Sequence, residues 1–193
     1  TSVSRGLGDV YKRQEIVQGD FTPNAETIAS SDIELNGVGF AYTGRENVFE
    51  GLNLTIKSNE TTGIVGATGS GKTTLIRLLL RFAEPKEGSI EWAGKPLPEW
   101  NLDTLRSSMS LVDQHITLFP TSILENIRYG NPEASDEEVK AAGFVAEASS
   151  FIEELPDSWE TLVGEGGHRL SGGQRQRIAI ARAVLKNAPV LIS

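Results

Sequence analysis

The sequence predicts an α/β fold in which a small antiparallel sheet, a glycine-rich strand–loop–helix unit and a helical region follow one another. Three observations support this prediction. Apolar residues alternate between residues 33 and 56, and a short apolar run leads through a glycine-rich loop into a strong helix candidate. The residue pattern from His115 to about Leu170 predicts helices. This order of elements is typical of layered α/β domains.

The first strands are predicted from apolar residues that recur with a period of two. Asn36 and Gly37 interrupt this parity, so we expect a bulge or turn there. Two alternating runs close together in the chain predict an antiparallel sheet. The alternating residues are Ile33, Leu35, Val38, Phe40 and Tyr42 in the first run and Leu52, Leu54 and Ile56 in the second.

Short apolar runs and helix signals predict the next elements. The run "TTGIVG" (61–66) predicts a strand buried on both faces. The run "GKTTLIRLLLRF" (71–82) predicts a helix that cannot continue through Pro85. Three later runs predict strands that complete a mixed sheet: "GSIEWAG" (88–94), "SMSLVDQ" (108–114) and "PVLI" (189–192).

The helical region carries three Ser-x-x-Glu pairs with the spacing of a capping box, so we expect helices to begin there and to form a subdomain at about residues 115–170. A further helix is predicted over residues 171–186, "SGGQRQRIAIARAVLK", with four apolar residues on one side. The pairs are Ser122 with Glu125, Ser135 with Glu138 and Ser150 with Glu153, and the apolar residues are Ile178, Ala181, Val184 and Leu185.

Composition limits the classes of function. The 193 residues carry a net charge of −8 and include no cysteine. The acidic charge argues against nonspecific nucleic-acid binding, and the lack of cysteine excludes a disulfide scaffold and a thiolate metal site. No apolar run approaches the ~18–20 residues that span a bilayer. Met109 is the only methionine, so we expect the sequence to belong to a longer protein.

Two segments precede the predicted fold. Residues 1–14, "TSVSRGLGDVYKRQ", are basic in an acidic chain and lack periodicity. They are interpreted either as a disordered basic arm or as an adapter-like scar that is not native coding sequence. Residues 15–31 are polar, contain Pro23 and are interpreted as a linker.

The sequence "GATGSGKT" (66–73) fits the phosphate-binding pattern G-x-x-x-x-G-K-[ST] between a predicted strand and a predicted helix. Its glycines let successive N–H groups turn toward a polyphosphate, and the helix adds its positive N-terminal end. Lys72 would reach the β- and γ-phosphates, and the Thr73 hydroxyl would hold Mg²⁺. The residues expected to bind nucleotide are Gly66, Ala67, Thr68, Gly69, Ser70, Gly71, Lys72, Thr73 and Thr74.

The sequence "LSGGQ" (170–174) indicates a second anion site. Ser171 and Gln174 fit a capping box, but capping does not explain two consecutive glycines, which weaken a first helical turn. Gly172 and Gly173 leave bare backbone at a helix N-terminus, where anions bind. Two anion-binding ends this far apart in one chain are explained if they face each other across a dimer.

With both motifs in place, the chain from Asp32 to Ile192 resembles the nucleotide-binding domain of an ATP-binding cassette (ABC) transporter. The resemblance implies a P-loop NTPase (RecA-like) core with an antiparallel β subdomain and an α-helical subdomain, as well as ATP and Mg²⁺ as ligands. It also implies a head-to-tail dimer, homomeric or heteromeric. In that dimer the residues that act on the partner's nucleotide are Ser171, Gly172, Gly173 and Gln174.

The same resemblance assigns two further residues. Tyr42 stands where family members stack an aromatic ring on adenine. Gln114 stands where a glutamine contacts Mg²⁺ and the attacking water, so it and Lys72 are the expected catalytic residues. His115 and His168 are interpreted as loop residues. Asn59 replaces a common glycine and tolerates a left-handed conformation.

Two segments, "LFPTSILENIRYGNP" and "VGEGGHRLSGGQ", resemble exporter-type members of this family. The resemblance implies that the chain from Leu118 to Gly130, the chain from Val163 to Gly167 and the region of Gln114 contact coupling helices of a membrane domain. The protein would then act at the cytoplasmic face of a membrane, without a nucleic-acid partner. Residues 15–31 would lead from that membrane domain.

In the family pattern, the last predicted strand is followed by one apolar residue and an Asp–Glu pair that supports Mg²⁺ and polarises water. The sequence reaches Ser193 before these carboxylates. The intact protein is therefore expected to hydrolyse ATP to power export, and residues 1–193 to bind ATP weakly without hydrolysing it. The alternatives are a soluble ABC ATPase that acts on DNA or ribosomes and a regulatory nucleotide-binding module that never hydrolyses ATP.

Overall fold

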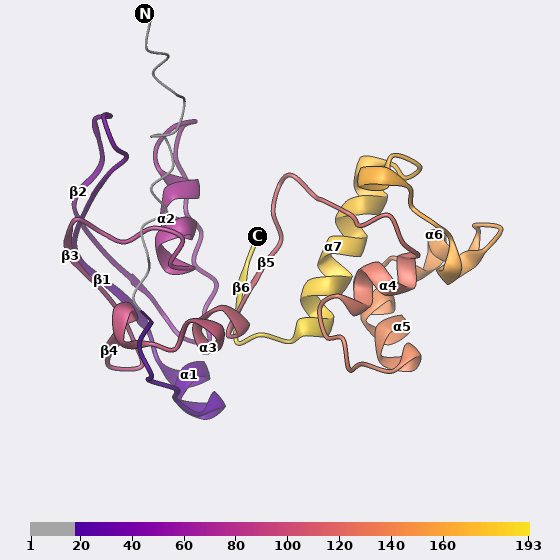
Figure 1. Cartoon of the computed structure of the whole chain (residues 1–193), viewed down its shortest axis with the longest axis horizontal. Helices are drawn as coiled ribbons and strands as arrows, with labels where there is room; N and C mark the ends of the chain where they lie inside the picture. Colours follow the sequence, from indigo (N-terminus) through magenta and orange to yellow (C-terminus); the bar gives the residue numbers. More distant parts are fainter. Residues whose placement is uncertain (1–17) are drawn as a thin grey trace, which may run out of the picture.

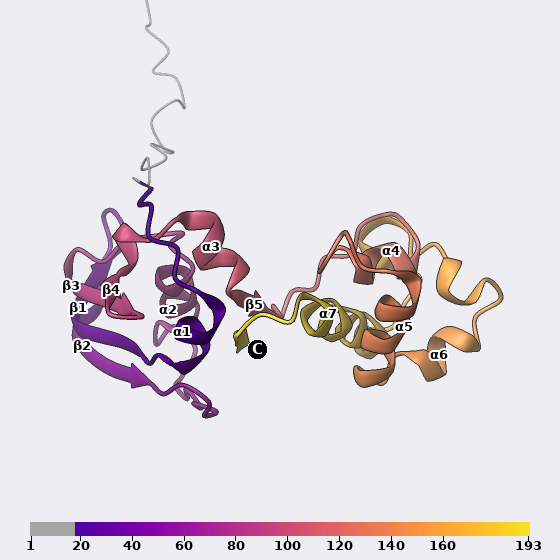
Figure 2. The ribbon, with the colours of Figure 1, turned by 90° about the horizontal axis from the view of Figure 1, so that it is seen from below.

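The computed structural model describes residues 18–193 and arranges them in two lobes (Figure 1). The core lobe comprises residues 18–111 and 190–192, and the helical lobe comprises residues 116–186. A second view shows that the connection between the lobes runs through β5 (Met109–Leu111) and β6 (Val190–Ile192) (Figure 2). The predicted nature of residues 1–14 lies outside the described residues.

The core lobe is built on a four-stranded antiparallel sheet with strand order β2-β1-β3-β4. Its strands are β1 (Ile33–Ala41), β2 (Asn47–Ile56), β3 (Glu87–Trp92) and β4 (Lys95–Pro96). The register shifts between Leu35 and Val38, and Gly37 adopts a left-handed φ of 60°. The predicted antiparallel sheet and its bulge at residues 36–37 are therefore confirmed.

Three short helices and one longer helix complete the core lobe. They are α1 (Ala25–Ser30), α2 (Lys72–Leu79), the 3₁₀ helix η1 (Leu97–Glu99) and α3 (Leu102–Ser107). Helix α2 ends earlier than the sequence predicts, because Arg81 adopts a left-handed φ of 49° that stops the helix before Pro85 can. Helix α1 lies within the predicted linker 15–31 and buries Ile28, which the sequence analysis did not anticipate.

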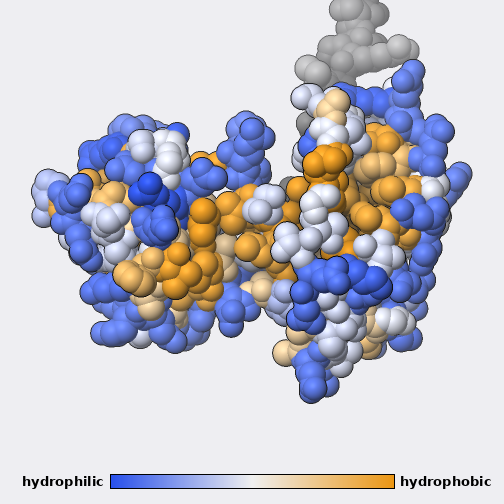
Figure 3. Space-filling view, turned by 180° about the vertical axis from the view of Figure 1, so that it is seen from behind, coloured by the Kyte–Doolittle hydropathy of each residue, from blue (hydrophilic) through white to orange (hydrophobic). Residues whose placement is uncertain are grey.

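A predicted strand is missing from the core lobe. Residues 61–66 form no strand, and the side chains of Ile64 and Val65 are 44% and 95% exposed. Exposed apolar side chains are visible on both lobes in the space-filling view (Figure 3). A strand buried on both faces needs a hydrogen-bonded neighbour, and no described strand pairs with this segment. The predicted mixed sheet is therefore wrong: β5 and β6 form a separate two-stranded parallel sheet.

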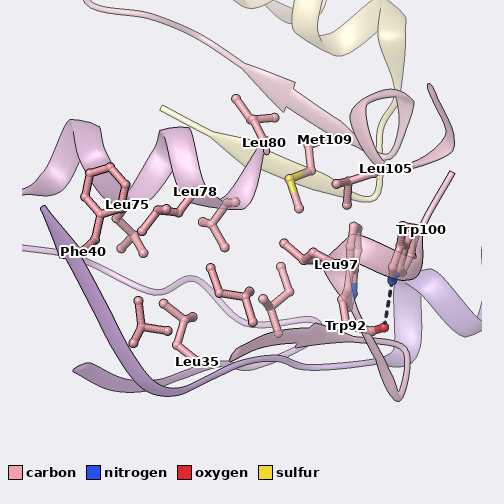
Figure 4. Close-up of a cluster of buried hydrophobic side chains, with 14 of the residues drawn as sticks. Leu35, Phe40, Leu75, Leu78, Leu80, Trp92, Leu97, Trp100, Leu105 and Met109 are labelled. Carbon is pink, nitrogen blue, oxygen red and sulfur yellow. Dashed lines mark hydrogen bonds between the residues drawn. The ribbon is translucent and has the colours of Figure 1, made fainter. Parts of the chain in front are cut away.

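Two stacked indole rings lie in the apolar core of the core lobe. Trp92 of β3 and Trp100 lie 5.0 Å apart between ring centroids and 14° from parallel. The Trp100 indole N–H donates a 3.2 Å hydrogen bond to the carbonyl of Trp92 (Figure 4). Leu78 of α2 packs into the same cluster, so burial of the apolar face of α2 fixes the helix against the sheet.

The helical lobe has its own apolar core. Its elements are α4 (Ile123–Arg128), α5 (Asp136–Val145), α6 (Ser149–Glu153), the 3₁₀ helices η2 (Ser158–Glu160) and η3 (Glu165–Gly167), and α7 (Gly172–Lys186). All four apolar residues predicted for one side of α7 contribute to this core. No helix among residues 18–193 has the length and apolarity needed to cross a membrane.

Two of the three predicted caps in this lobe form. Ser135 makes a full capping box with Glu138, and the Ser122 hydroxyl accepts a hydrogen bond from the backbone N–H of Glu125. The third prediction is wrong, because Ser150 lies inside α6, whose N-cap residue is Ala148. The spacing Ser150–Glu153 is therefore coincidental.

Candidate nucleotide-binding site

The phosphate-binding loop is held in shape by its own lysine. Lys72 Nζ donates hydrogen bonds to the carbonyls of Gly66 (2.6 Å) and Ala67 (3.0 Å). The N–H of Ser70 donates to the same Ala67 carbonyl at 3.1 Å. These bonds fold residues 66–72 into a turn at the start of α2 and hold the Lys72 cation against the carbonyls at the start of the loop.

Two glycines of this loop cannot be replaced without moving their neighbours. Gly71 has a left-handed φ of 96°, and a Cβ there would lie 2.7 Å from the Phe49 ring and 2.8 Å from the Val48 side chain. A Cβ on Gly66 would lie 2.4 Å from Ser70 Oγ. Because the loop leaves its backbone bare, its N–H groups can approach a polyphosphate closely.

The first turn of α2 supplies the remaining ligands. Gly71 caps the helix without a side-chain hydrogen bond, so the backbone N–H groups of this turn stay available to an anion. The Thr73 side chain is exposed, and a hydroxyl oxygen is a donor that Mg²⁺ accepts. The residues present therefore fit a magnesium nucleotide: Lys72 would hold its phosphates and Thr73 its metal ion.

The structure brings Tyr42 to this site. Its hydroxyl lies 3.1 Å from Thr74 Oγ1, in the first turn of α2, and its ring packs edge-on against Phe40. Thr74 itself is buried, so this hydrogen bond joins the end of β1 to the base of the P-loop. The predicted contact of Tyr42 with adenine remains a prediction.

Among the described residues, no hydrogen bond joins Gln114 to the P-loop. It lies in an exposed bend three residues beyond the end of β5, where the chain leaves the core lobe. The neighbouring backbone is shaped by a 3.3 Å hydrogen bond from the N–H of His115 to Asp113 Oδ1. Among residues 18–193, Gln114 has no hydrogen bond that fixes its amide, so its roles in metal and water binding remain predictions.

The second anion motif lies in the other lobe, at the N-terminus of α7 (Figure 1). Ser171 accepts a 3.2 Å hydrogen bond from the N–H of Gln174, and the Gln174 side chain accepts a 2.8 Å bond from the N–H of Ser171. The predicted capping box is thus present. Gly172 and Gly173 are both exposed, and a Cβ on Gly173 would meet no heavy atom within 4 Å. Packing within residues 18–193 therefore does not require glycine at position 173.

The two segments predicted to contact a membrane domain lie side by side. The N–H of Val163 donates to the Thr121 carbonyl, and the N–H of Ile123 donates to the Thr161 carbonyl, both at 3.1 Å. The Val163 side chain is fully buried, so the surface of segment 163–167 is formed by the residues that follow it. Close by in the chain, Phe119 and Tyr129 form an exposed aromatic pair with ring centroids 4.7 Å apart.

A buried polar residue that the sequence analysis missed supports this surface. Asn126 of α4 is fully buried and binds both backbone groups of Phe119, at 2.9 Å and 3.0 Å. Arg182 of α7 donates to the Asn126 side chain and to its carbonyl, and its guanidinium lies 5.7 Å from the rings of Phe119 and Tyr129. Burial lowers the pKa of Arg182 from its usual value. An Asn within an otherwise apolar helix face was the available signal.

The remaining predicted positions are structural. Nδ1 of His168 lies 3.1 Å from the Glu165 carbonyl in an exposed loop, and His115 is exposed. Asn59 has a φ of 57°, the left-handed conformation that its residue type was expected to tolerate. Within residues 18–193, no group of three or more His, Asp or Glu side chains is arranged to hold a metal ion.

A glycine-lined phosphate loop with a lysine at the start of its helix, set in an α/β core, defines a P-loop nucleotide-binding domain. Comparison with known families gives the narrower assignment. The profile of the family described as ABC transporter matches residues 49–193, and the chain belongs to this family. The predicted resemblance and the predicted fold class are confirmed.

Individual relatives agree. The chain is 44% identical over 199 aligned residues to ABC transporter B family member 3 of Dictyostelium discoideum, covering 98% of this chain and 14% of that protein. It is 51% identical over 162 residues to the ATP-dependent lipid A-core flippase of Alkalilimnicola ehrlichii, covering 83% and 28%. The chain therefore spans between a seventh and a third of these relatives.

A solved structure shows the same fold. It is described as a bacterial Atm1-family ABC exporter with ATP bound, and it matches 90% of this chain and 30% of its own with a TM-score of 0.83 and 37% identity. At 37% identity the similarity extends to the sequence, so this protein is a relative as well as a structural match.

Proposed function

We propose that this chain is the ATP-binding part of an exporter and that the protein containing it uses ATP hydrolysis to move a substrate across a membrane. The observation that carries the proposal is the pair of phosphate motifs at the N-termini of α2 and α7, in different lobes. The relatives named as a flippase and as an exporter support the transport direction.

The P-loop residues have distinct roles in this proposal. Lys72, which binds the carbonyls of its own loop in the structure, exchanges these partners for the β- and γ-phosphates when nucleotide binds. Thr73 would hold Mg²⁺, which would supply positive charge beside the phosphates. Tyr42, linked to the first turn of α2 by its hydroxyl, lies where it can contact the adenine. Gln114 orients the water that attacks the γ-phosphate.

The second motif acts on a nucleotide held by another copy or by a related domain. Gly172 and Gly173 are exposed glycines in a first helical turn, where alanine would favour the helix. Outside its own helical turn, a Cβ on Gly173 would meet no heavy atom of residues 18–193 within 4 Å, which supports a need for bare backbone that comes from a molecule approaching it. A γ-phosphate bound to the P-loop of a partner has the right charge for this helix end.

Coupling to a membrane domain is proposed for the joined segments 118–130 and 163–167. They form one surface because residues 121–123 and 161–163 are hydrogen-bonded to each other. The exposed rings of Phe119 and Tyr129 give that surface an apolar centre, as expected where a helix docks. The protein that contains this chain would then act at the cytoplasmic face of a membrane.

For residues 1–193 alone, we propose weak ATP binding without turnover. Weak binding follows from the missing strand at residues 61–66, since the segment that should support the P-loop is exposed along its whole length. ATP turnover needs a carboxylate that polarises the attacking water. Among the proposed catalytic and metal-binding residues, Lys72, Thr73 and Gln114, none carries one, so we propose no turnover.

Calorimetric titration of the 193-residue chain with ATP and MgCl₂ tests the site. Lys72→Ala is expected to weaken binding at least ~10-fold, because it removes the cation that contacts two phosphates. Lys140→Ala is the matched control, since Lys140 is an exposed lysine of α5. Equal affinity in the Lys72→Ala chain would contradict the proposal, as would steady ATP turnover by the purified 193-residue chain.

A further inference from the structure

The last residue of α7 reaches across to the core lobe. Lys186 Nζ donates hydrogen bonds to the carbonyls of Arg106 (2.9 Å) and Met109 (2.6 Å). These carbonyls lie at the end of α3 and the start of β5. Of the side chains of α7, all of which belong to described residues, Lys186 is the one that bonds to the core lobe. Burial lowers the pKa of Lys186, and the two carbonyls compensate for its lost hydration.

The same turn binds the end of the P-loop helix. Arg106 Nε donates to the carbonyl of Leu80 (3.2 Å), and its Nη2 donates to the carbonyl of Arg81 (3.1 Å). Its guanidinium also lies 4.7 Å from the centre of the Phe82 ring. Leu80 is the C-cap residue of α2 and Arg81 follows it, so Arg106 binds two carbonyls just beyond the end of the helix, where the helix itself supplies no partner.

Arg106 therefore connects two helices. Its side chain binds the C-terminal end of α2, and its carbonyl accepts from Lys186 at the C-terminal end of α7. Leu80 and Met109, which neighbour the bonded residues in the chain, lie near each other in one buried cluster (Figure 4). The two helices that carry the phosphate motifs at their N-termini are thus tied, at their far ends, to a single turn.

The length of α7 makes this tie sensitive. The helix has 15 residues. At about 1.5 Å per residue it is ~22 Å long, so a tilt of ~10° about its C-terminal end displaces its N-terminus by ~4 Å. A shift of that size separates a hydrogen bond from no contact at all. The position of Ser171 therefore depends on how firmly Lys186 is held.

We propose that Arg106 and Lys186 are positioning residues that set the orientation of α7, and so of the corner 171–174, relative to the P-loop helix. The consequence for nucleotide chemistry rests on the proposed function, in which this corner meets a phosphate of a partner. The orientation itself is a property of the single chain. It can be measured without nucleotide.

The chain offers a clean way to measure this orientation. It contains no cysteine, so Thr55→Cys on β2 and Ala141→Cys on α5 provide two exposed thiols, one on each lobe. A nitroxide spin label is attached to each thiol. Double electron–electron resonance then gives the distribution of distances between the two labels, and so between the lobes. Lys186→Met keeps the length of the side chain and removes its donors, whereas Lys186→Arg keeps a cation. Lys140→Met is the control on an exposed lysine.

Lys186→Met is expected to broaden or shift the distance distribution by at least ~3 Å, whereas Lys186→Arg and Lys140→Met leave it as in the parent chain. Arg106→Lys, which keeps the charge but loses the two-carbonyl fork, should broaden it as well. Arg106→Lys combined with Lys186→Met should add little further, because both changes open one link. An unchanged distribution in folded Lys186→Met would overturn the proposal, even if the melting temperature falls.

The second variant guards against misfolding. If Lys186→Met does not fold, an Arg106→Lys chain with native circular dichroism and an unchanged distribution also overturns the proposal. The same samples are then titrated with ATP and MgCl₂. A parent chain that shows no nucleotide binding counts against the proposed function, while the effect of Lys186→Met on the nucleotide-free distribution still decides whether the link exists.

Discussion

Replacing Gly173 by alanine should make the chain more stable, although the residue belongs to the motif from which the family is identified. Gly173 lies in the first turn of α7, its φ is not left-handed, and a Cβ would meet no heavy atom within 4 Å. Glycine costs a helix about 0.5–1 kcal/mol relative to alanine. We therefore expect Gly173→Ala to raise the free energy of unfolding of the helical lobe by up to ~1 kcal/mol.

Gly71→Ala in the other phosphate motif should have the opposite effect. Gly71 has a left-handed φ of 96°, where an alanine is strained by roughly 1–2 kcal/mol. Its Cβ would also lie 2.7 Å from the Phe49 ring and 2.8 Å from Val48, so the β2 side chains must move. We expect the core lobe to lose at least ~2 kcal/mol in total. The two substitutions are chemically identical and differ only in backbone geometry and surroundings.

Hydrogen exchange of the 193-residue chain in increasing urea measures both changes, because it reports each lobe separately and does not assume that they unfold together. Loss of stability in the helical lobe on Gly173→Ala would refute the steric argument. Under the proposed function, the same substitution in a full-length exporter should reduce ATP hydrolysis despite the gain in stability. Full activity there would refute the requirement for bare backbone.

Three further predictions follow from single contacts. Asn126→Ala should destabilise the helical lobe by about 2–4 kcal/mol in urea unfolding, since it removes hydrogen bonds from a fully buried side chain. Ser135→Ala should lower the free energy of unfolding by about 1 kcal/mol, because it removes the cap of α5. Ser150→Ala should change that free energy by no more than ~0.5 kcal/mol, because Ser150 lies inside α6. Equal losses would contradict the assigned start of α6. Hydrogen bonds from Lys57 and from the N–H of Ser58 lower the pKa of Asp32. The contribution of Asp32 to stability is therefore present above the ordinary carboxyl range and is lost as pH falls through the lowered pKa. Asp32→Asn should remove this acid dependence, as measured by thermal unfolding from pH 7 to pH 2.

Local patterns predicted the elements that local forces determine. The bulge at residues 36–37 follows from a break in alternation next to a glycine, and the cap at Ser135 follows from hydrogen bonds within one helical turn. The left-handed conformation at Asn59 follows from the side chain itself. For the cap, both hydrogen bonds lie within one helical turn, so the sequence contains the whole interaction. The bulge also has a distant partner, because the N–H of Gly37 donates a hydrogen bond to Asn53 Oδ1 in β2.

Long-range partners explain what the sequence analysis missed. The run 61–66 has the composition of a central strand, but a strand forms only beside another strand, and none pairs with it among residues 18–193. Ser150 has the spacing of a cap, yet the chain has already entered α6 at Ser149. Lys186 binds carbonyls 77 and 80 residues away, a partnership that no local pattern indicates.

The same contrast bears on the proposed function, in which a second copy or a related domain completes the site. Each phosphate motif is fixed by local bonds: Lys72 closes the P-loop on itself, and Ser171 with Gln174 closes the start of α7. The distance between the motifs depends instead on two lobes with separate apolar cores, connected by short strands and one lysine. Motifs that are each fixed locally on separate lobes suit the proposed function, in which the two phosphate motifs meet across a partner and then separate. A frame fixed by a shared core would hold either arrangement but could not pass between them.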